Sequence, residues 1–158
     1  MSKIPNDTQN RISKTFQKRL KDIAIDEELN MKEFANSTGV SLPVIRLAFQ
    51  FGIIPSVRTL IKIADFAEIS FDYLVGFTNS NDFIKAYTVS SFHTRYEELR
   101  ATKKVKNSQV ANVMPFSRNF ISEWKRNKTL PSLDYLKALA DYFEVSIDYL
   151  LGRSDYKN

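Results

Sequence analysis

The 158-residue sequence contains no cysteine, only four glycines, and a single histidine and a single tryptophan. Without cysteine, disulfide bonds, thiol catalysis and cysteine-bound metals are excluded. The scarcity of glycine, with frequent Leu, Ile, Lys, Glu and Ala, favours helices. No apolar run approaches the roughly 18–20 residues of a membrane span, and the start, MSKIPNDTQN, has no signal-peptide core. We therefore expect a cytoplasmic protein without membrane association.

Patterns that carry catalysis or metal binding are also missing. The single histidine, His93, aligns with Gln17 in an internal repeat of the chain. Acidic pairs such as Glu27-Glu28 and Glu97-Glu98 are expected to lie on solvent-exposed surfaces of helices. The sequence has no Gly-rich phosphate loop, no metal-ligand cluster and no nucleophile with a matching base. We expect neither an enzyme nor a bound cofactor.

The net charge of +5 is unevenly distributed along the chain. Residues 12–77 hold eight Lys and Arg against eight Asp and Glu, whereas residues 88–158 hold twelve against eight. A surplus of positive charge is a weak indication of an anionic partner. The second half of the chain is therefore the part expected to meet such a partner.

The internal repeat runs through the chain at one constant offset, which aligns Phe16 with Phe92. Residues 55–76 match residues 131–152 at 11 of 22 positions, and residues 16–54 match residues 92–130 at 6 of 39. No insertion or deletion is needed, so two copies of one small domain are predicted. The expected parts are an N-terminal extension at 1–11, a first domain at 12–77, a linker at 78–87 and a second domain at 88–158.

Helix signals follow the same order in both copies, which predicts a five-helix bundle for each. Apolar residues recur at spacings of three and four, and serine or asparagine precedes the later helices as an N-cap. The expected caps are Asn30, Ser41, Ser56, Ser70, Ser117, Ser132 and Ser146. The positions expected to be buried are Phe16, Leu20, Ile23, Phe34, Ala35, Thr38, Leu60, Ile63 and Ala64, and Phe92, Tyr96, Leu99, Val110, Ala111, Met114, Leu136, Leu139 and Ala140.

The stretch from Ser117 to Gly152, SRNFISEWKRNKTLPSLDYLKALADYFEVSIDYLLG, resembles the helix-turn-helix family of phage Cro/CI repressors and Xre-type bacterial regulators. A weaker similarity covers nearly the whole chain, twice. The resemblance implies an all-α fold of two tandem lambda-repressor-like five-helix domains. In such domains the second and third helices form the motif, and the third enters the major groove of DNA. Pro115 replaces the family's turn glycine, so a tilt of the third helix is expected.

In the second copy, the resemblance implies polar side chains where such domains contact DNA. Arg118 can donate two hydrogen bonds to guanine, and Asn119 can pair with adenine. Glu123 can accept from a cytosine amine or hold a neighbouring arginine. Base reading is expected from Arg118, Asn119, Ser122 and Glu123. Phosphate contacts are expected from Asn107, Ser117, Lys125, Arg126, Asn127 and Lys128.

The first copy has different chemistry at these positions. The counterparts of the base-reading residues are Leu42, Pro43, Arg46 and Leu47. Leucine and proline cannot read hydrogen-bond patterns, so this copy is not expected to read DNA. The segment SLPVIRLAFQFGIIP is more apolar than one buried face requires, which predicts a surface covered by a partner. Its expected members are Leu42, Pro43, Val44, Leu47, Phe49, Phe51 and Ile53. The alternative is local repacking, for instance with residues 1–11 or the linker.

These patterns together predict a sequence-specific regulator of transcription that binds double-stranded DNA. The second domain would read DNA, and the first would form a homodimer or bind a protein partner. The alternative is a protein-binding module, such as an antirepressor, an antitoxin-like protein or an inhibitor, that keeps the fold without reading DNA. In a third arrangement both copies grip DNA as a pseudo-dimer. A phage-like origin is suggested only by the resemblance to this family, which includes phage repressors.

Overall fold

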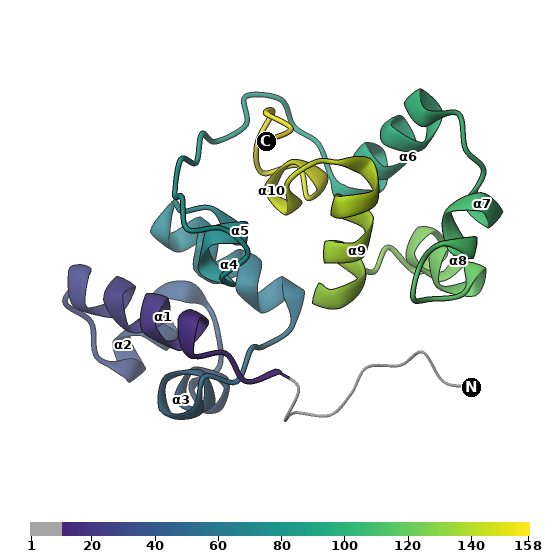
Figure 1. The fold of residues 1–158 in the computed structure, drawn as a ribbon. Helices are drawn as coiled ribbons and strands as arrows, with labels where there is room; N and C mark the ends of the chain where they lie inside the picture. The colour runs from purple at the N-terminus through teal and green to yellow at the C-terminus, as the bar shows by residue number, and fades with distance from the viewer. Residues whose placement is uncertain (1–10) are drawn as a thin grey trace. The chain divides into compact units, whose positions relative to one another are not determined.

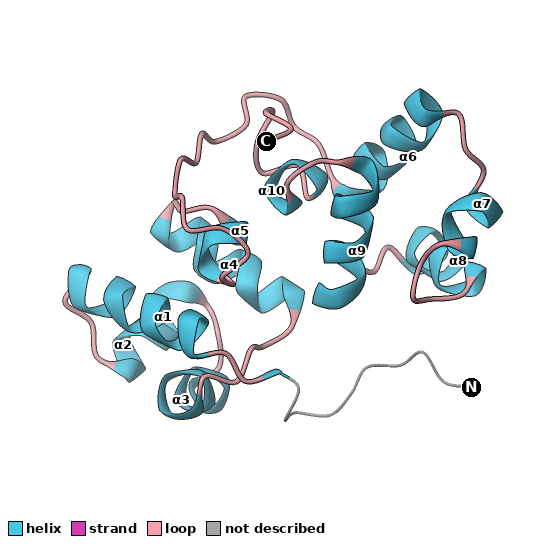
Figure 2. Ribbon diagram, viewed as in Figure 1, coloured by secondary structure: helices cyan, strands magenta, loops and turns pink. Residues whose placement is uncertain are grey.

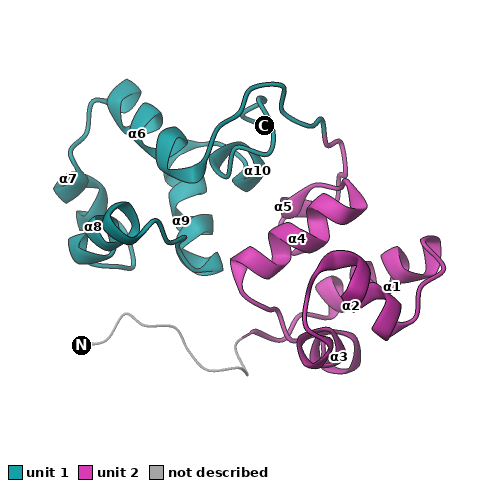
Figure 3. Ribbon diagram, turned by 180° about the vertical axis from the view of Figure 1, so that it is seen from behind, with its two compact units in different colours: residues 1–5, 84–158 teal, residues 6–83 magenta. Residues whose placement is uncertain are grey.

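The computed structural model describes residues 11–158, and their regular structure is helical apart from one isolated bridge between Ile12 and Ile53 (Figures 1 and 2). These residues form two compact units. The N-terminal unit has the described residues 11–83 and is unit 2 in Figure 3; the C-terminal unit has residues 84–158 and is unit 1 there. The predicted all-helical fold is confirmed for the described residues. The extension expected at 1–11 lies, except for Arg11, outside them.

The N-terminal unit has five helices, and most of them start at a predicted cap. Asn30 accepts a hydrogen bond from the Glu33 N–H, while the Glu33 carboxylate accepts one from the Asn30 N–H, which makes a capping box. Ser56 and Ser70 each accept from the N–H of the third residue of their helix. The helices are α1 (Lys14–Asp26), α2 (Met31–Thr38), α3 (Leu42–Phe51), α4 (Val57–Ala67) and α5 (Phe71–Leu74).

The C-terminal unit also has five helices, in nearly the same register. Its last three helices begin and end at the positions that the repeat aligns with the ends of α3, α4 and α5, and its second begins opposite the start of α2. They are α6 (Phe92–Lys103), α7 (Asn107–Asn112), α8 (Arg118–Asn127), α9 (Leu133–Phe143) and α10 (Ile147–Leu150). The predicted core positions of both units are buried, except for Met114, which is half-buried beyond the end of α7.

Residues with left-handed backbone conformation recur at the offset of the sequence repeat. Four residues of the N-terminal unit with positive φ have a counterpart with positive φ in the C-terminal unit. The pairs are Glu28 and Lys104, Gly52 and Lys128, Glu68 and Glu144, and Gly76 and Gly152. A side chain costs energy in this conformation, and lysine and glutamate nevertheless adopt it, so the two units share the same turns at equivalent positions.

The turn between the second and third helices is where the two units differ. In the N-terminal unit α2 runs to Thr38, and Gly39 ends it with φ of 75°. Pro115 takes the place of Gly39, and the residue before a proline is disfavoured in helical conformation. Accordingly α7 ends at Asn112, short of Met114, the position that aligns with the end of α2. The expected tilt of α8 stays a prediction.

In each unit an arginine of the first helix donates hydrogen bonds to backbone carbonyls at the end of the fifth helix. We call this set of contacts the arginine clasp. Arg95 donates to the carbonyls of Tyr149 and Ser154 at 2.7 and 2.9 Å, and its guanidinium lies 4.0 Å from the centre of the Tyr149 ring. Arg19, its counterpart in the repeat, makes the same contacts with the Tyr73 and Thr78 carbonyls and the Tyr73 ring. These bonds bring a charged donor to carbonyls at and just beyond the end of the fifth helix, and they connect the first helix to the fifth in each unit.

Candidate nucleic-acid interface

Buried aromatic side chains pack against the inner side of helix α8 and fix which of its sides faces outward. Ile121 and Trp124 are buried on its inner side. The Trp124 ring lies 5.0 Å from Phe116, which is fully buried in the preceding turn. Phe116 in turn lies 4.8 Å from Tyr135 of α9. Because these bulky rings pack together, rotation of α8 about its axis is prevented.

The four predicted base-reading residues all lie on the opposite side of α8 and are exposed. Arg118 and Ser122 are four residues apart, as are Asn119 and Glu123, so the two pairs form one continuous face. This face combines a guanidinium fork, an amide, a hydroxyl and a carboxylate. Such a set can both donate to and accept from the edges of base pairs.

The C-terminal end of α8 is basic. Lys125, Arg126, Asn127 and Lys128 are all exposed, and Lys128 ends the helix in left-handed conformation with φ of 55°. Ser117, also exposed, holds the N-cap position with extended backbone. The predicted phosphate-contacting residues on α8 are thus at its two ends, on either side of the base-reading face.

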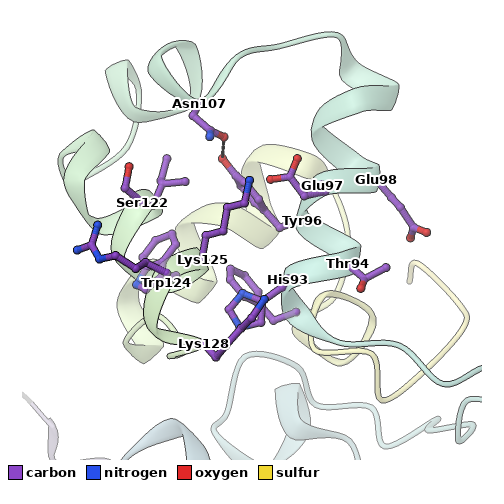
Figure 4. Close-up of a pocket in the computed structure, with 13 residues that line it drawn as sticks. His93, Thr94, Tyr96, Glu97, Glu98, Asn107, Ser122, Trp124, Lys125 and Lys128 are labelled. Carbon is purple, nitrogen blue, oxygen red and sulfur yellow. Dashed lines mark hydrogen bonds between the residues drawn. The ribbon is translucent and has the colours of Figure 1, made fainter.

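Asn107, the remaining predicted phosphate contact, opens α7 and is oriented by a bond that sequence reasoning missed. The Tyr96 hydroxyl of α6 donates to the Asn107 side-chain oxygen at 2.8 Å. Burial raises the pKa of Tyr96, so the hydroxyl keeps its proton. With its oxygen held, the amide of Asn107 offers its NH₂ group as the donor. Figure 4 shows this bond, with Lys125 and Ser122 of α8 on the other side of the same pocket.

The equivalent surface of the N-terminal unit is apolar. Leu47 and Phe51 of α3 are 45% and 58% exposed, and Pro43 is exposed as well. Leu42, Val44 and Ile53 are half-buried. Residues 11–13 run beside Ile53: the Ser13 N–H donates to the Gly52 carbonyl at 2.9 Å, and the Ile54 N–H donates to the Arg11 carbonyl at 2.8 Å.

The prediction that Phe49 belongs to this exposed surface is wrong. Phe49 is only 8% exposed, and its ring meets Phe34 of α2 edge-on at a centroid distance of 5.5 Å. Gln17 of α1 donates to the Phe49 carbonyl at 2.8 Å and draws the end of α3 toward α1. The apolar α3 face is therefore defined by Leu42, Pro43, Val44, Leu47 and Phe51, together with Ile53 just beyond the end of the helix.

Two further observations bear on the chemistry available to the described residues. Among residues 11–158 no group of three or more His, Asp or Glu side chains is placed to hold a metal ion. Over the same range, every helix is too short or too polar to cross a membrane.

Comparison with known proteins bears on the C-terminal unit. Residues 97–150 match the model of the Helix-turn-helix family, which covers about a third of the chain and includes every predicted DNA-contacting residue. Residues 97–150 form a helix-turn-helix domain. This domain reaches from within α6 to the end of α10 and contains the whole of α7 and α8.

A curated relative agrees with this assignment. The chain is 35% identical over 61 residues to the HTH-type transcriptional activator BcrR of Enterococcus faecalis. The match covers 39% of this chain and 30% of the activator, so the chain spans less than a third of that relative. No solved structure gives a significant match.

Proposed function

We propose that this protein regulates transcription by binding specific double-stranded DNA, with α8 of the helix-turn-helix domain in the major groove. The observation that carries the proposal is the exposed polar face of α8, formed by Arg118, Asn119, Ser122 and Glu123. It lies on the helix that such domains insert into DNA. The similarity to a transcriptional activator supports the same class of function.

In this proposal the side chains divide into two groups by role. Arg118 pairs with the O6 and N7 of a guanine, and Asn119 with the N6 and N7 of an adenine. Ser122 and Glu123 reach the neighbouring base pairs. Asn107, Ser117 and the basic end of α8 bind phosphates, which give affinity and register but no sequence choice.

We further propose that the N-terminal unit is a second, degenerate copy of the same domain, used for assembly. The helix register, the left-handed positions and the arginine clasp all recur at the offset of the sequence repeat and support this view. The reading positions, however, hold Leu42, Pro43, Arg46 and Leu47. A face of this kind favours apolar contacts with protein over contacts with DNA.

Replacing Lys125 and Arg126 together by alanine is expected to weaken binding to all DNA sequences alike. Each lost phosphate contact reduces the slope of log K against log salt concentration by about one, so the double variant loses about two per binding domain. Fluorescence anisotropy of a labelled duplex, measured over a series of salt concentrations, gives the slope. An unchanged slope would show that the basic end of α8 does not contact phosphate.

The protein is expected to be a homodimer that places two α8 helices on half-sites about one helical turn (roughly 34 Å) apart, or a multiple of it. A single reading helix seldom supplies enough affinity, and the apolar α3 face offers a second contact surface. Light scattering at micromolar concentration measures the mass directly. A monomer both with and without DNA would rule out this assembly.

The exposed apolar face of α3 also favours a second candidate, a protein-binding module such as an antirepressor, an antitoxin-like protein or an inhibitor. In that case the chain keeps the fold but uses protein contacts. The two candidates are separated by the salt titration: a DNA-binding regulator shows steeply salt-dependent binding, whereas complete absence of DNA binding favours the module.

A further inference from the structure

A pocket of about 830 Å³ lies in the C-terminal unit between α6 and α8. Its apolar lining is mainly aromatic: Phe92 and Tyr96 come from α6, and Trp124 comes from α8 together with Ile121. Tyr96 and Trp124 are labelled in Figure 4. The Phe92 ring lies 5.8 Å from Trp124 and 6.0 Å from Tyr96. The volume falls in the range of about 300–1,000 Å³ that is typical of sites for small organic ligands.

The N-terminal unit has a different arrangement at the equivalent place. There, Phe49 turns inward against Phe34, and Gln17 donates across the gap to the Phe49 carbonyl at 2.8 Å. Their counterparts in the repeat are His93 for Gln17 and Lys125 for Phe49, and both line the pocket. The C-terminal unit therefore lacks the aromatic side chain and the glutamine that bring the two helices together in the other unit.

The rim of the pocket carries more positive than negative charge. Lys125, Arg126 and Lys128 line it from the α8 side. On the α6 side are Glu97 and Glu98, but Glu97 forms an ion pair with Arg100, which compensates its charge. Aromatic rings below a cationic rim favour a flat apolar molecule that carries an anionic group.

We infer that this pocket binds a planar aromatic anion, and that the bound molecule weakens the binding of DNA. The second half of the inference rests on the proposed function, because Asn107, Lys125, Arg126 and Lys128 both line the pocket and are the proposed phosphate contacts. An anion held by these cations competes with the DNA backbone for the same charge.

The test uses two fluorescent probes that differ in one group. Anilinonaphthalene sulfonate is an aromatic anion built on a planar naphthalene ring, and phenylnaphthylamine is the same framework without the sulfonate. Trp124 is the single tryptophan of the chain and lines the pocket, so its quenching reports occupation. The sulfonate is expected to bind the full chain at least tenfold more tightly than the neutral probe. Absence of sulfonate binding, or equal affinity for both probes, would overturn the inference.

Variants locate the bound probe. Lys125→Glu is expected to weaken sulfonate binding about tenfold and phenylnaphthylamine binding much less, since Lys125 is exposed and the substitution changes mainly the charge of the rim. Lys32→Glu, which changes the net charge equally from an exposed position on α2, is the matched control and should have no effect. Equal effects of the two variants would mean that the probe senses only overall charge.

A second variant closes the pocket in the way the N-terminal unit does. His93→Gln combined with Lys125→Phe introduces the residues of positions 17 and 49, and is expected to abolish binding of both probes. Circular dichroism and the Trp124 unfolding transition verify that the variant is folded. Undiminished probe binding by the folded variant would overturn the inference; if the variant does not fold, the comparison of Lys125→Glu with Lys32→Glu decides.

A DNA titration tests the coupling separately. At a saturating concentration of the sulfonate probe, DNA affinity is expected to fall about tenfold relative to methanesulfonate at the same ionic strength. Unchanged affinity with the probe bound would overturn the coupling but not the pocket. A chain that binds the probe but never binds DNA would refute the proposed function instead, so the two failures are distinguishable.

Discussion

Replacing Arg118 and Asn119 by alanine is expected to remove most of the protein's preference for its target sequence. Each bidentate contact with a base is worth about 1–3 kcal/mol, so the double variant should bind the preferred site about 2–6 kcal/mol more weakly. Binding to unrelated DNA should change little, because the phosphate contacts remain. Competition between specific and unrelated duplexes at one salt concentration measures the difference.

Two features of the structure allow the effect of these substitutions to be assigned to lost base contacts. Arg118 and Asn119 are exposed, while the residues that hold α8 in place are Phe116, Ile121 and Trp124 on its inner side. The fold should therefore survive the substitutions. Arg46→Ala is the matched control, since Arg46 is the exposed cation at a reading position of α3. If Arg46→Ala relaxed the preference as strongly, both units would grip DNA as a pseudo-dimer, contrary to the proposed division of roles.

Arg95→Met is expected to destabilise the C-terminal unit by about 3–5 kcal/mol, since a hydrogen bond to a charged group is worth about 1.5–3 kcal/mol and a buried group left unpaired costs a similar amount. Arg95 is only 4% exposed, and its loss removes the charged donor to the Tyr149 and Ser154 carbonyls, of which Tyr149 still accepts from the Gly152 N–H. Methionine fills the space of the stem but supplies no donor.

Urea unfolding followed by tryptophan fluorescence measures this effect in one unit, because Trp124 is the chain's single tryptophan. Lys137→Met serves as the control. Lys137 forms an exposed ion pair with Asp141 at 2.7 Å, and such pairs contribute about 0–1 kcal/mol. A loss below about 1 kcal/mol for Arg95→Met, no more than an exposed pair contributes, would contradict the role of the arginine clasp.

Local signals in the sequence predicted the helices well. The capping residues Asn30, Ser56 and Ser132 act through hydrogen bonds within one turn, and such bonds depend on few neighbours. The apolar spacing similarly identified the core face of each helix. The face of α8 followed from the same logic, since Ile121 and Trp124 face inward and leave Arg118, Asn119, Ser122 and Glu123 exposed.

Contacts between distant residues were not predictable in the same way. Phe49 was expected at the surface because its counterpart, Lys125, is polar; its burial depends on Phe34 of α2, a partner that alignment of the copies does not reveal. Arg19 and Arg95 are one of the few identical pairs in the diverged part of the repeat. Their role depends on hydrogen bonds to the chain at the end of α5 or α10, which the sequence does not reveal.

The α6–α8 pocket illustrates the same limit. Two of its aromatic residues, Phe92 and Tyr96, were correctly expected in the core, and Trp124 is buried as well. Space between two helices, however, depends on how closely they approach, and this is set by side chains such as Gln17 and Phe49 in the other unit. Composition and periodicity carry no information about that distance.

Selection of bound sites from a pool of random DNA duplexes with the purified chain measures whether the protein reads a specific DNA sequence. We expect strong enrichment of a short motif that contains guanine and adenine, repeated with two-fold symmetry at a spacing of about one helical turn (roughly 34 Å) or a multiple. The enrichment is expected to disappear with the Arg118→Ala/Asn119→Ala variant. Failure to enrich any sequence, together with no salt-dependent retention of DNA, would show that the protein does not read DNA.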